Sequence, residues 1–177
     1  MLVYVQALIN IVLCRRGPED LPDSGFLLVL TVIVYAMLHV PAVFIRDVAM
    51  AEVLVQVALS IALAFAFIRI LLQLAGFPQR NRQVLTALFG TGALLTALIL
   101  PLMIWLQSAP QSQSALPLPG LILLIITLWS VVVDAHIIAR ALSRPFVVGL
   151  LLSIVYFLLY QTLRSGLLPP PGVQSMS

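Results

Sequence analysis

The chain has 177 residues, of which 62% are hydrophobic and 8% are charged, and its mean hydropathy is +1.16. A soluble domain carries roughly 25% charged residues and cannot bury this much apolar surface, so the composition excludes a water-soluble fold. The net charge of +3 comes from nine arginines and no lysine, set against six acids. Because the arginines are spread over the ends of apolar segments, we also exclude nucleic acid as a partner.

The first segment, Leu2–Leu13, is apolar but too short to cross a bilayer. Gln6, Asn10 and Cys14 recur at helical spacing and form a narrow polar stripe. The positive charges of Arg15–Arg16 follow the apolar run, whereas those of a signal peptide precede it. We predict a short interfacial amphipathic helix along the cytoplasmic headgroups, anchored by these arginines. Alternatively, this helix contacts another membrane subunit.

Five apolar stretches of membrane-spanning length fill most of the remaining chain. A helix rising about 1.5 Å per residue needs roughly 20 apolar residues to cross the ~30 Å hydrocarbon layer. We therefore predict an all-α integral membrane protein: an N-terminal helix and linker over residues 1–25, a five-helix transmembrane domain over 26–163, and a flexible tail over 164–177. The predicted spans are Phe26–Ile45, Met50–Ala75, Leu85–Leu106, Leu121–Ala141 and Phe146–Leu163.

Two local sequence features mark where the first of these spans begins and where its regular helix ends. Asp23 or Ser24 supplies a helix N-cap, so the helix should begin near Gly25. Pro41 should kink the helix or end its regular hydrogen bonding near the far end.

The placement of arginine predicts how the spans are oriented. If the N-terminus is cytoplasmic, only Arg46 and Arg164 face the other side of the membrane. The reverse orientation would place most of the arginines on the outer side, whereas cytoplasmic loops normally carry the excess of positive charge. We therefore predict a cytoplasmic N-terminus and a C-terminus on the opposite side of the membrane. The arginines that then anchor the cytoplasmic interface are Arg15, Arg16, Arg80, Arg82, Arg140 and Arg144.

Two opposite charges fall inside the second and fourth predicted spans. An aspartate in such a helix costs several kcal/mol unless it is paired, hydrated or protonated. Arg69 lies roughly 10 Å and Asp134 roughly 13 Å from the inner ends of their helices, so the two charges share a similar depth. We predict that they face each other across an interface between these two spans and fix the helix register.

Two alternatives to this pair stay open. In the first, Arg69 reaches the membrane interface while Asp134 is protonated or hydrogen-bonded to Ser130. In the second, a proton or ion pathway runs through Asp134 and His136.

Small residues recur at four-residue spacing in the third and fifth spans. Such pairs let two helices approach closely where no hydrophobic effect drives their association. We predict that they pack helices within the bundle; contact with a second copy or a partner is the alternative. The pairs are Thr86 with Gly90, Gly92 with Thr96, and Gly149 with Ser153.

Residue patterns that carry catalysis or metal binding are absent from the sequence. It contains no HExxH, GxSxG, paired carboxylates or Cys/His metal spacing. We therefore predict a protein that is not an enzyme and that has no metal ion or cofactor.

Three segments, Arg15–Pro22, Gln83–Leu94 and Trp129–Ile138, carry a family resemblance that covers nearly the whole chain. They resemble small uncharacterised proteobacterial inner-membrane proteins, which look like distant members of the Ypt-interacting-protein (Yip) five-span family. Eukaryotic Yip proteins have a longer cytosolic N-terminal region with an aspartate-leucine-tryptophan-glycine-proline motif, and this chain has neither. The resemblance therefore implies five spans in a bacterial inner membrane and a membrane-organising or adaptor role, without catalytic residues. The placement of arginine then predicts a periplasmic C-terminus.

We expect a non-enzymatic scaffold, adaptor or accessory subunit of a membrane assembly. Its partners would be the lipid bilayer and either another membrane protein or a second copy of the chain. A small transporter or channel component that uses Arg69, Asp134 and His136 as a polar pathway is the alternative. A water-filled cavity at Asp134 favours the transporter, and a dry Asp134 favours the adaptor.

Overall fold

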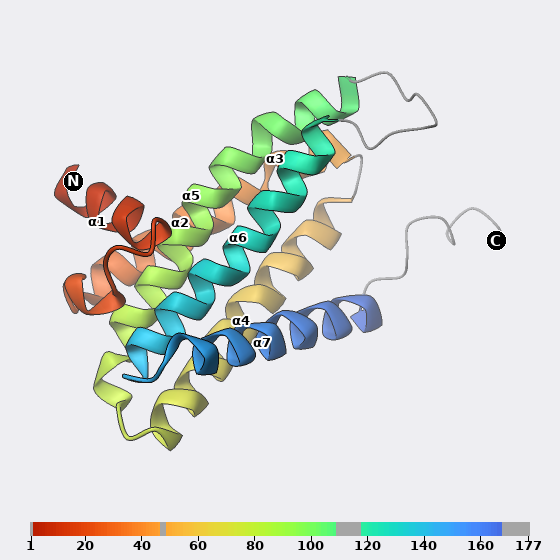
Figure 1. Cartoon of the computed structure of the whole chain (residues 1–177). Coiled ribbons are helices and arrows are strands. Elements are labelled where there is room, and N and C mark those ends of the chain that lie inside the picture. The colour runs from red at the N-terminus through yellow and green to blue at the C-terminus, as the bar shows by residue number, and fades with distance from the viewer. Residues whose placement is uncertain (1, 47–48, 109–117, 168–177) are drawn as a thin grey trace.

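The computed structural model describes residues 2–46, 49–108 and 118–167 (Figure 1). Over these ranges the chain forms helices joined by short connections, with no strand. Residues 109–117 and most of the predicted tail lie outside the described residues. The helices are α1 (Leu2–Val12), η1 (Pro18–Asp20), α2 (Gly25–His39), α3 (Pro41–Arg46), α4 (Met50–Leu74), η2 (Pro78–Arg80), α5 (Asn81–Ser108), α6 (Leu118–Ala141) and α7 (Phe146–Leu167).

Five stretches in the described part of the chain are long and apolar enough to cross a membrane, which confirms the prediction of five such helices. They are α2 with α3, α4, α5, α6 and α7. The Ser24 hydroxyl accepts a hydrogen bond from the backbone N–H of Leu27 at 3.4 Å, so α2 begins at Gly25 as predicted. Pro41 separates α2 from α3. Helix α7 continues to Leu167 and thus extends into the predicted tail.

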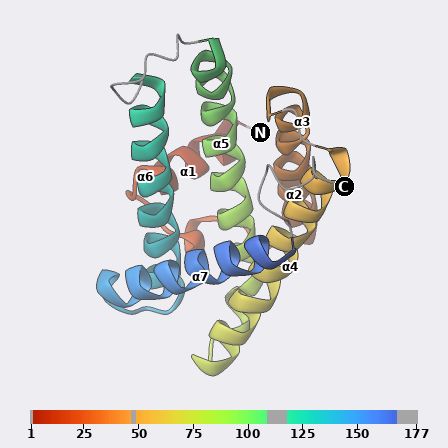
Figure 2. The ribbon, with the colours of Figure 1, turned by 90° about the vertical axis from the view of Figure 1, so that its right-hand side faces the viewer.

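Helix α5 is the centre of the bundle, because α1, α2, α4 and α6 all pack against it. Helices α5 and α6 run side by side in both views, and α4 diverges from them at one end (Figures 1 and 2). Helix α7 crosses the bundle obliquely and reaches from α6 to α4. The hydroxyl of Ser153 on α7 donates a hydrogen bond to the carbonyl of Val131 on α6 at 2.9 Å.

One end of the bundle is formed by the start of α2, α5 and α7 and the ends of α4 and α6, and it carries Arg80, Arg82, Arg140 and Arg144. We call it the arginine-rich end. Much of the buried core lies in the adjoining half of the bundle, where α4, α5 and α6 meet. Its members there include Ile68, Leu72, Val84, Leu85, Ile137, Ile138 and Ala141.

Glycine allows the close approach of α7 to α6. A Cβ atom added to Gly149 would collide with the backbone carbonyl of Ala135 and lie 2.7 Å from Cβ of Ala139. Ser153, one turn further along α7, is buried. This small-residue pair therefore lies at the contact between two helices of the same chain.

Candidate functional site

Helix α1 packs against the bundle through one narrow face. Ala7, Leu8 and Ile11 are buried, while Val5 and Ile9 on the other side are exposed. The Leu8 side chain lies over Gly90 of α5, where an added Cβ would come within 2.7 Å of Leu8 Cδ2. Helix α1 therefore lies alongside the half of α5 and α6 nearest the arginine-rich end, not beyond that end (Figure 1).

Side chains of α5 and α6 hold the rest of the N-terminal segment, residues 2–23, by its backbone carbonyls. Trp129 Nε1 donates to the carbonyl of Val12 at 3.1 Å. His136 Nε2 lies 2.9 Å from the carbonyl of Arg16, and because a carbonyl only accepts, Nε2 carries the proton. Gln83 Nε2 donates to the carbonyl of Leu21 at 2.8 Å in the same way. His136 is thus bound to the N-terminal segment.

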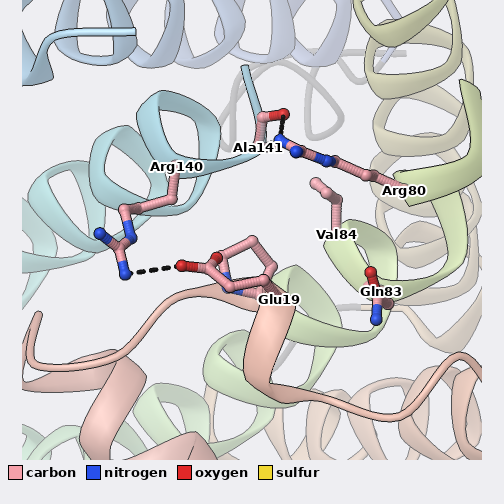
Figure 3. Close-up of a pocket in the computed structure, with 7 residues that line it drawn as sticks. Glu19, Arg80, Gln83, Val84, Arg140 and Ala141 are labelled. Carbon is pink, nitrogen blue, oxygen red and sulfur yellow. Dashed lines mark hydrogen bonds and ion pairs between the residues drawn. The ribbon is translucent and has the colours of Figure 1, made fainter. Parts of the chain in front are cut away.

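Where the N-terminal segment reaches the arginine-rich end, it closes over a small pocket. The pocket opens to the outside and holds only about 10 Å³, roughly the space of one water molecule. Figure 3 shows Arg140 pointing toward Glu19 and away from Arg80, with an ion pair of 2.6 Å between Arg140 and Glu19. Arg80 Nη1 donates to the carbonyl of Ala141 at 2.9 Å and to the Ser143 hydroxyl at 3.0 Å. Arg80 therefore satisfies a carbonyl that the end of α6 leaves without a helical partner.

The six arginines predicted as interface anchors divide into two groups. Arg80 and Arg140 make the contacts above, and Arg82 lies 3.9 Å from Asp23. The remaining three, Arg15, Arg16 and Arg144, have exposed side chains. Their role as anchors in a headgroup layer stays a prediction.

The remaining predicted packing residues also lie along α5. Thr86 is fully buried and donates to the carbonyl of Arg82 at 2.7 Å, while Thr96 is half-buried. Gly92 faces the ring of Tyr35, which would lie 3.2 Å from an added Cβ. Gly90 and Gly92 thus accommodate different neighbours, Leu8 of α1 and Tyr35 of α2.

Displacing Leu8 should release Cys14, the single cysteine. Burial raises the pKa of the half-buried Cys14 thiol above its ordinary value, which reduces the reactive thiolate at neutral pH. We expect Gly90→Phe to undock α1 and to increase the rate of Cys14 alkylation by N-ethylmaleimide at pH 7 by about tenfold. In the unsubstituted protein the rate should still rise with pH above 9.0, the ordinary value for the thiol. Gly25→Phe is the control, because nothing lies within 4 Å of that position. An unchanged rate in Gly90→Phe would show that Leu8 does not hold α1 in place.

The predicted ion pair between Arg69 and Asp134 is wrong. Over the described ranges the ion pairs are Arg82 with Asp23 and Arg140 with Glu19. Helices α4 and α6 each pack mainly on α5 and α7, so the expected interface between the second and fourth spans does not form. Arg69 lies nine residues, or two and a half turns, after the buried Ser60, and it is therefore on the outward side of α4.

The outward side of α4 combines small residues with polar ones. Ala58, Ala62 and Ala66 follow each other at four-residue spacing and are exposed. Arg69 and Gln73 continue this face toward the arginine-rich end and are exposed as well. The Arg69 guanidinium makes no ion pair or hydrogen bond with any residue that the structure describes. We call these five residues the α4 outer face.

Asp134 lies on the opposite side of α6 from the surface of the bundle. It follows the exposed Ile125 by nine residues, or two and a half turns, and its neighbours Val133 and Ala135 are fully buried. The Asp134 side chain nevertheless keeps partial exposure, and its carboxyl makes no hydrogen bond or ion pair with other described residues. Ser130 donates to the carbonyl of Thr127 at 2.7 Å, so it is not the partner of Asp134.

Tyrosines of two other helices lie in the same part of the bundle as this carboxyl. Asp134 is close enough to Tyr35 of α2 and Tyr156 of α7 to interact electrostatically with both, and Tyr160 interacts with the same two tyrosines. The Tyr35 hydroxyl donates to the Ser60 hydroxyl of α4 at 3.3 Å, and Ser60 donates to a backbone carbonyl of its own helix. We call Asp134, Tyr35, Tyr156, Tyr160 and Ser60 the inner polar cluster.

The sequence contained only a partial signal for this cluster. Tyr156 and Tyr160 are one turn apart in an apolar span, which suggests hydroxyls directed at a polar group between helices. Tyr35 and Ser60 gave no signal, because single polar residues in apolar spans do not reveal which helix they face. Within the described ranges no three His, Cys, Asp or Glu side chains are grouped so that they could hold a metal ion.

Comparison with known proteins adds no assignment to these sites. No family model, curated protein or solved structure matches the chain. The resemblance to the Yip five-span family stays a prediction.

Proposed function

We propose that the chain is a non-enzymatic accessory or scaffold subunit of a membrane assembly, embedded in a bacterial inner membrane with its N-terminus in the cytoplasm. We further propose that the α4 outer face binds a transmembrane helix of another protein. The observation that carries this proposal is Arg69, a cation on the outward side of a membrane-length helix with no partner in the described part of the chain.

The depth of Arg69 favours a partner. It precedes the last residue of α4, Leu74, by five residues, which is about 8 Å along the helix. A charged side chain at this depth is unfavourable in hydrocarbon by several kcal/mol unless it pairs or reaches the interface. An acidic residue on a neighbouring helix would supply the missing charge.

The small residues of the same face support a helix as the partner. Ala58, Ala62 and Ala66 leave a shallow surface on which another backbone can approach closely, as small residues do in other membrane helix pairs. Gln73 adds an amide one turn beyond Arg69. The buried stripe of α4, which includes Ala64 and Ile68, is used within the chain, so the outer face is available to a second protein.

Site-specific photocrosslinking in membranes tests the proposal. A photoreactive side chain at Ala66 should give one discrete protein adduct, and the same group at Leu128, exposed on α6, should not. Arg69→Leu should reduce the Ala66 adduct at least tenfold. The crosslinked protein should have a transmembrane acidic residue, and neutralising that residue should reduce the adduct to the same extent.

Three outcomes would contradict the proposed partner. Lipid adducts alone at Ala66 would mean that Arg69 extends to a headgroup phosphate. An adduct of twice the chain mass would identify a second copy as the occupant. If Arg69→Leu does not weaken the adduct, the charge of Arg69 takes no part in binding the partner.

A further inference from the structure

Helix α1 is apolar on the side that faces away from the bundle as well as on the side that packs against it. Val5, Ile9 and Leu13 follow each other at four-residue spacing on the outward side, and they are 43%, 45% and 47% exposed. A helix that meets water carries polar residues on its outward side, so an apolar one is suited to lipid chains. We call these three residues the α1 outer face.

The position of α1 along the bundle places this face at the level of the lipid chains. Leu8 packs over Gly90, which lies nine residues, or about 14 Å, from the start of α5. The carbonyl of Val12 is bound by Trp129, which lies twelve residues, or about 18 Å, from the end of α6. The α1 outer face therefore lies within the length of the membrane-spanning helices.

Two arginines follow the α1 outer face directly, and their backbone is fixed by both α1 and α6. The backbone N–H groups of Arg15 and Arg16 donate to the carbonyl of Asn10 at 2.9 and 3.4 Å. His136 of α6 binds the carbonyl of Arg16 at 2.9 Å. Both arginine side chains are exposed, and neither guanidinium makes an ion pair with a residue that the structure describes.

The acidic side chains of the N-terminal segment do not neutralise these two arginines. Each acid has another contact: Glu19 with Arg140 at 2.6 Å, Asp23 with Arg82 at 3.9 Å, and Asp20 with the backbone N–H of Gly17 at 3.4 Å. The N-terminal segment and the arginine-rich end together carry six arginines and these three acids. The surplus positive charge at the end of α1 thus attracts an anion from outside the chain.

We infer that the end of α1 binds one anionic phospholipid of the bilayer. Its phosphate contacts Arg15 and Arg16, because guanidinium groups donate paired hydrogen bonds to phosphate oxygens. One of its acyl chains lies along the α1 outer face. The occupant is a lipid and not a free phosphate compound, since the exposed apolar residues lead directly to the arginines. This site is separate from the α4 outer face, so either assignment can fail without the other.

Trp129 is a natural probe of this site. It lies at the end of α1, where it donates to the carbonyl of Val12 at 3.1 Å, and it is 41% exposed. The chain has two tryptophans, so Trp105→Phe leaves Trp129 as the single one. A lipid with brominated chains quenches the fluorescence of a tryptophan that it touches. The test places the full chain with Trp105→Phe in phosphatidylcholine vesicles and compares brominated phosphatidylglycerol with brominated phosphatidylcholine as quencher.

We expect phosphatidylglycerol to bind beside Trp129 at least about fivefold more tightly than phosphatidylcholine. Arg15→Gln combined with Arg16→Gln should reduce this ratio to about one, because the phosphate then has no cation to contact. Replacing both arginines by lysine keeps the charge and should keep at least about half of the preference. In vesicles without bromine, Trp129 should emit at the same wavelength in every variant, which shows that α1 stays docked.

Arg144→Gln is the matched control. It removes the same charge from the arginine-rich end, but Arg144 belongs to the connection after α6, where its backbone N–H donates to the carbonyl of Ala139 at 3.0 Å. The preference for phosphatidylglycerol should stay within about twofold of the unsubstituted value. A loss in Arg144→Gln equal to that in the double variant would show a diffuse attraction to the anionic surface and would overturn the discrete site.

Three further results would overturn the inference. A ratio of about one in the unsubstituted chain would mean that the arginines do not select an anionic lipid. A preference that survives the loss of both arginines would place the lipid elsewhere. Relief of quenching by excess glycerol phosphate, the soluble headgroup, would identify a free phosphate compound as the ligand.

Discussion

Gly149→Leu should lower the free energy of unfolding by about 3 kcal/mol, the largest loss that we expect from any single substitution in α7. Already the first added carbon would collide with the carbonyl of Ala135 and with Ala139, and these are parts of α6 that cannot rotate away. Helix α7 would have to separate from α6, which would also break the hydrogen bond from Ser153 to the carbonyl of Val131. Unfolding by sodium dodecyl sulfate in mixed micelles, followed by circular dichroism, measures the change.

Gly166→Leu is the matched control for this substitution. Gly166 lies on the same helix, but nothing is within 4 Å of an added Cβ there. Because glycine is a poor helix former, the control should leave the stability unchanged or raise it by up to about 1 kcal/mol. Equal losses at positions 149 and 166 would show that the close contact between α6 and α7 does not determine stability.

Asp134→Leu should raise the free energy of unfolding, by about 1–3 kcal/mol. Leucine has the same number and branching of side-chain heavy atoms as aspartate, and it removes a carboxyl that has no hydrogen bond or ion pair in the described part of the chain. Asp134→Asn should give a smaller gain, because the amide is still polar and unsatisfied. The same detergent titration measures both variants. A loss above about 1 kcal/mol in both would mean that the native carboxyl has a stabilising partner.

A gain in stability at Asp134 also has a functional reading. Residues that destabilise a fold are retained where they bind a ligand or carry a charge, and stability is then exchanged for function.

The sequence predicted the existence of the long helices and much of their extent, because length, hydropathy and local breakers determine both. Ser24 and Pro41 act within one turn of the chain, so their effects on α2 were readable. The ends of α7 were harder to place, since Arg164 and the residues after it are less apolar but still helical. The depth of a residue along its helix could also be predicted, because it follows from counting residues.

The direction in which each side chain points was not readable from the sequence. Helix α4 is apolar on nearly all sides, so nothing in its pattern shows that Ile68 faces inward and Arg69 outward. Equal depth made Arg69 and Asp134 look like partners, although Arg69 faces out of the bundle and Asp134 faces its interior. The contact of His136 with the carbonyl of Arg16 depends on the path of the N-terminal segment, which is a long-range feature.

The separation of Arg69 and Asp134 is the central claim, since it gives the outer face and the inner cluster different roles. A double-mutant cycle with Arg69→Leu and Asp134→Leu, measured by unfolding in mixed micelles, tests it most directly. We predict that the effects of the two substitutions add, with an interaction energy within about 0.5 kcal/mol of zero. An interaction energy above about 1 kcal/mol, with each single variant destabilised, would show that the two charges are paired and would contradict the account.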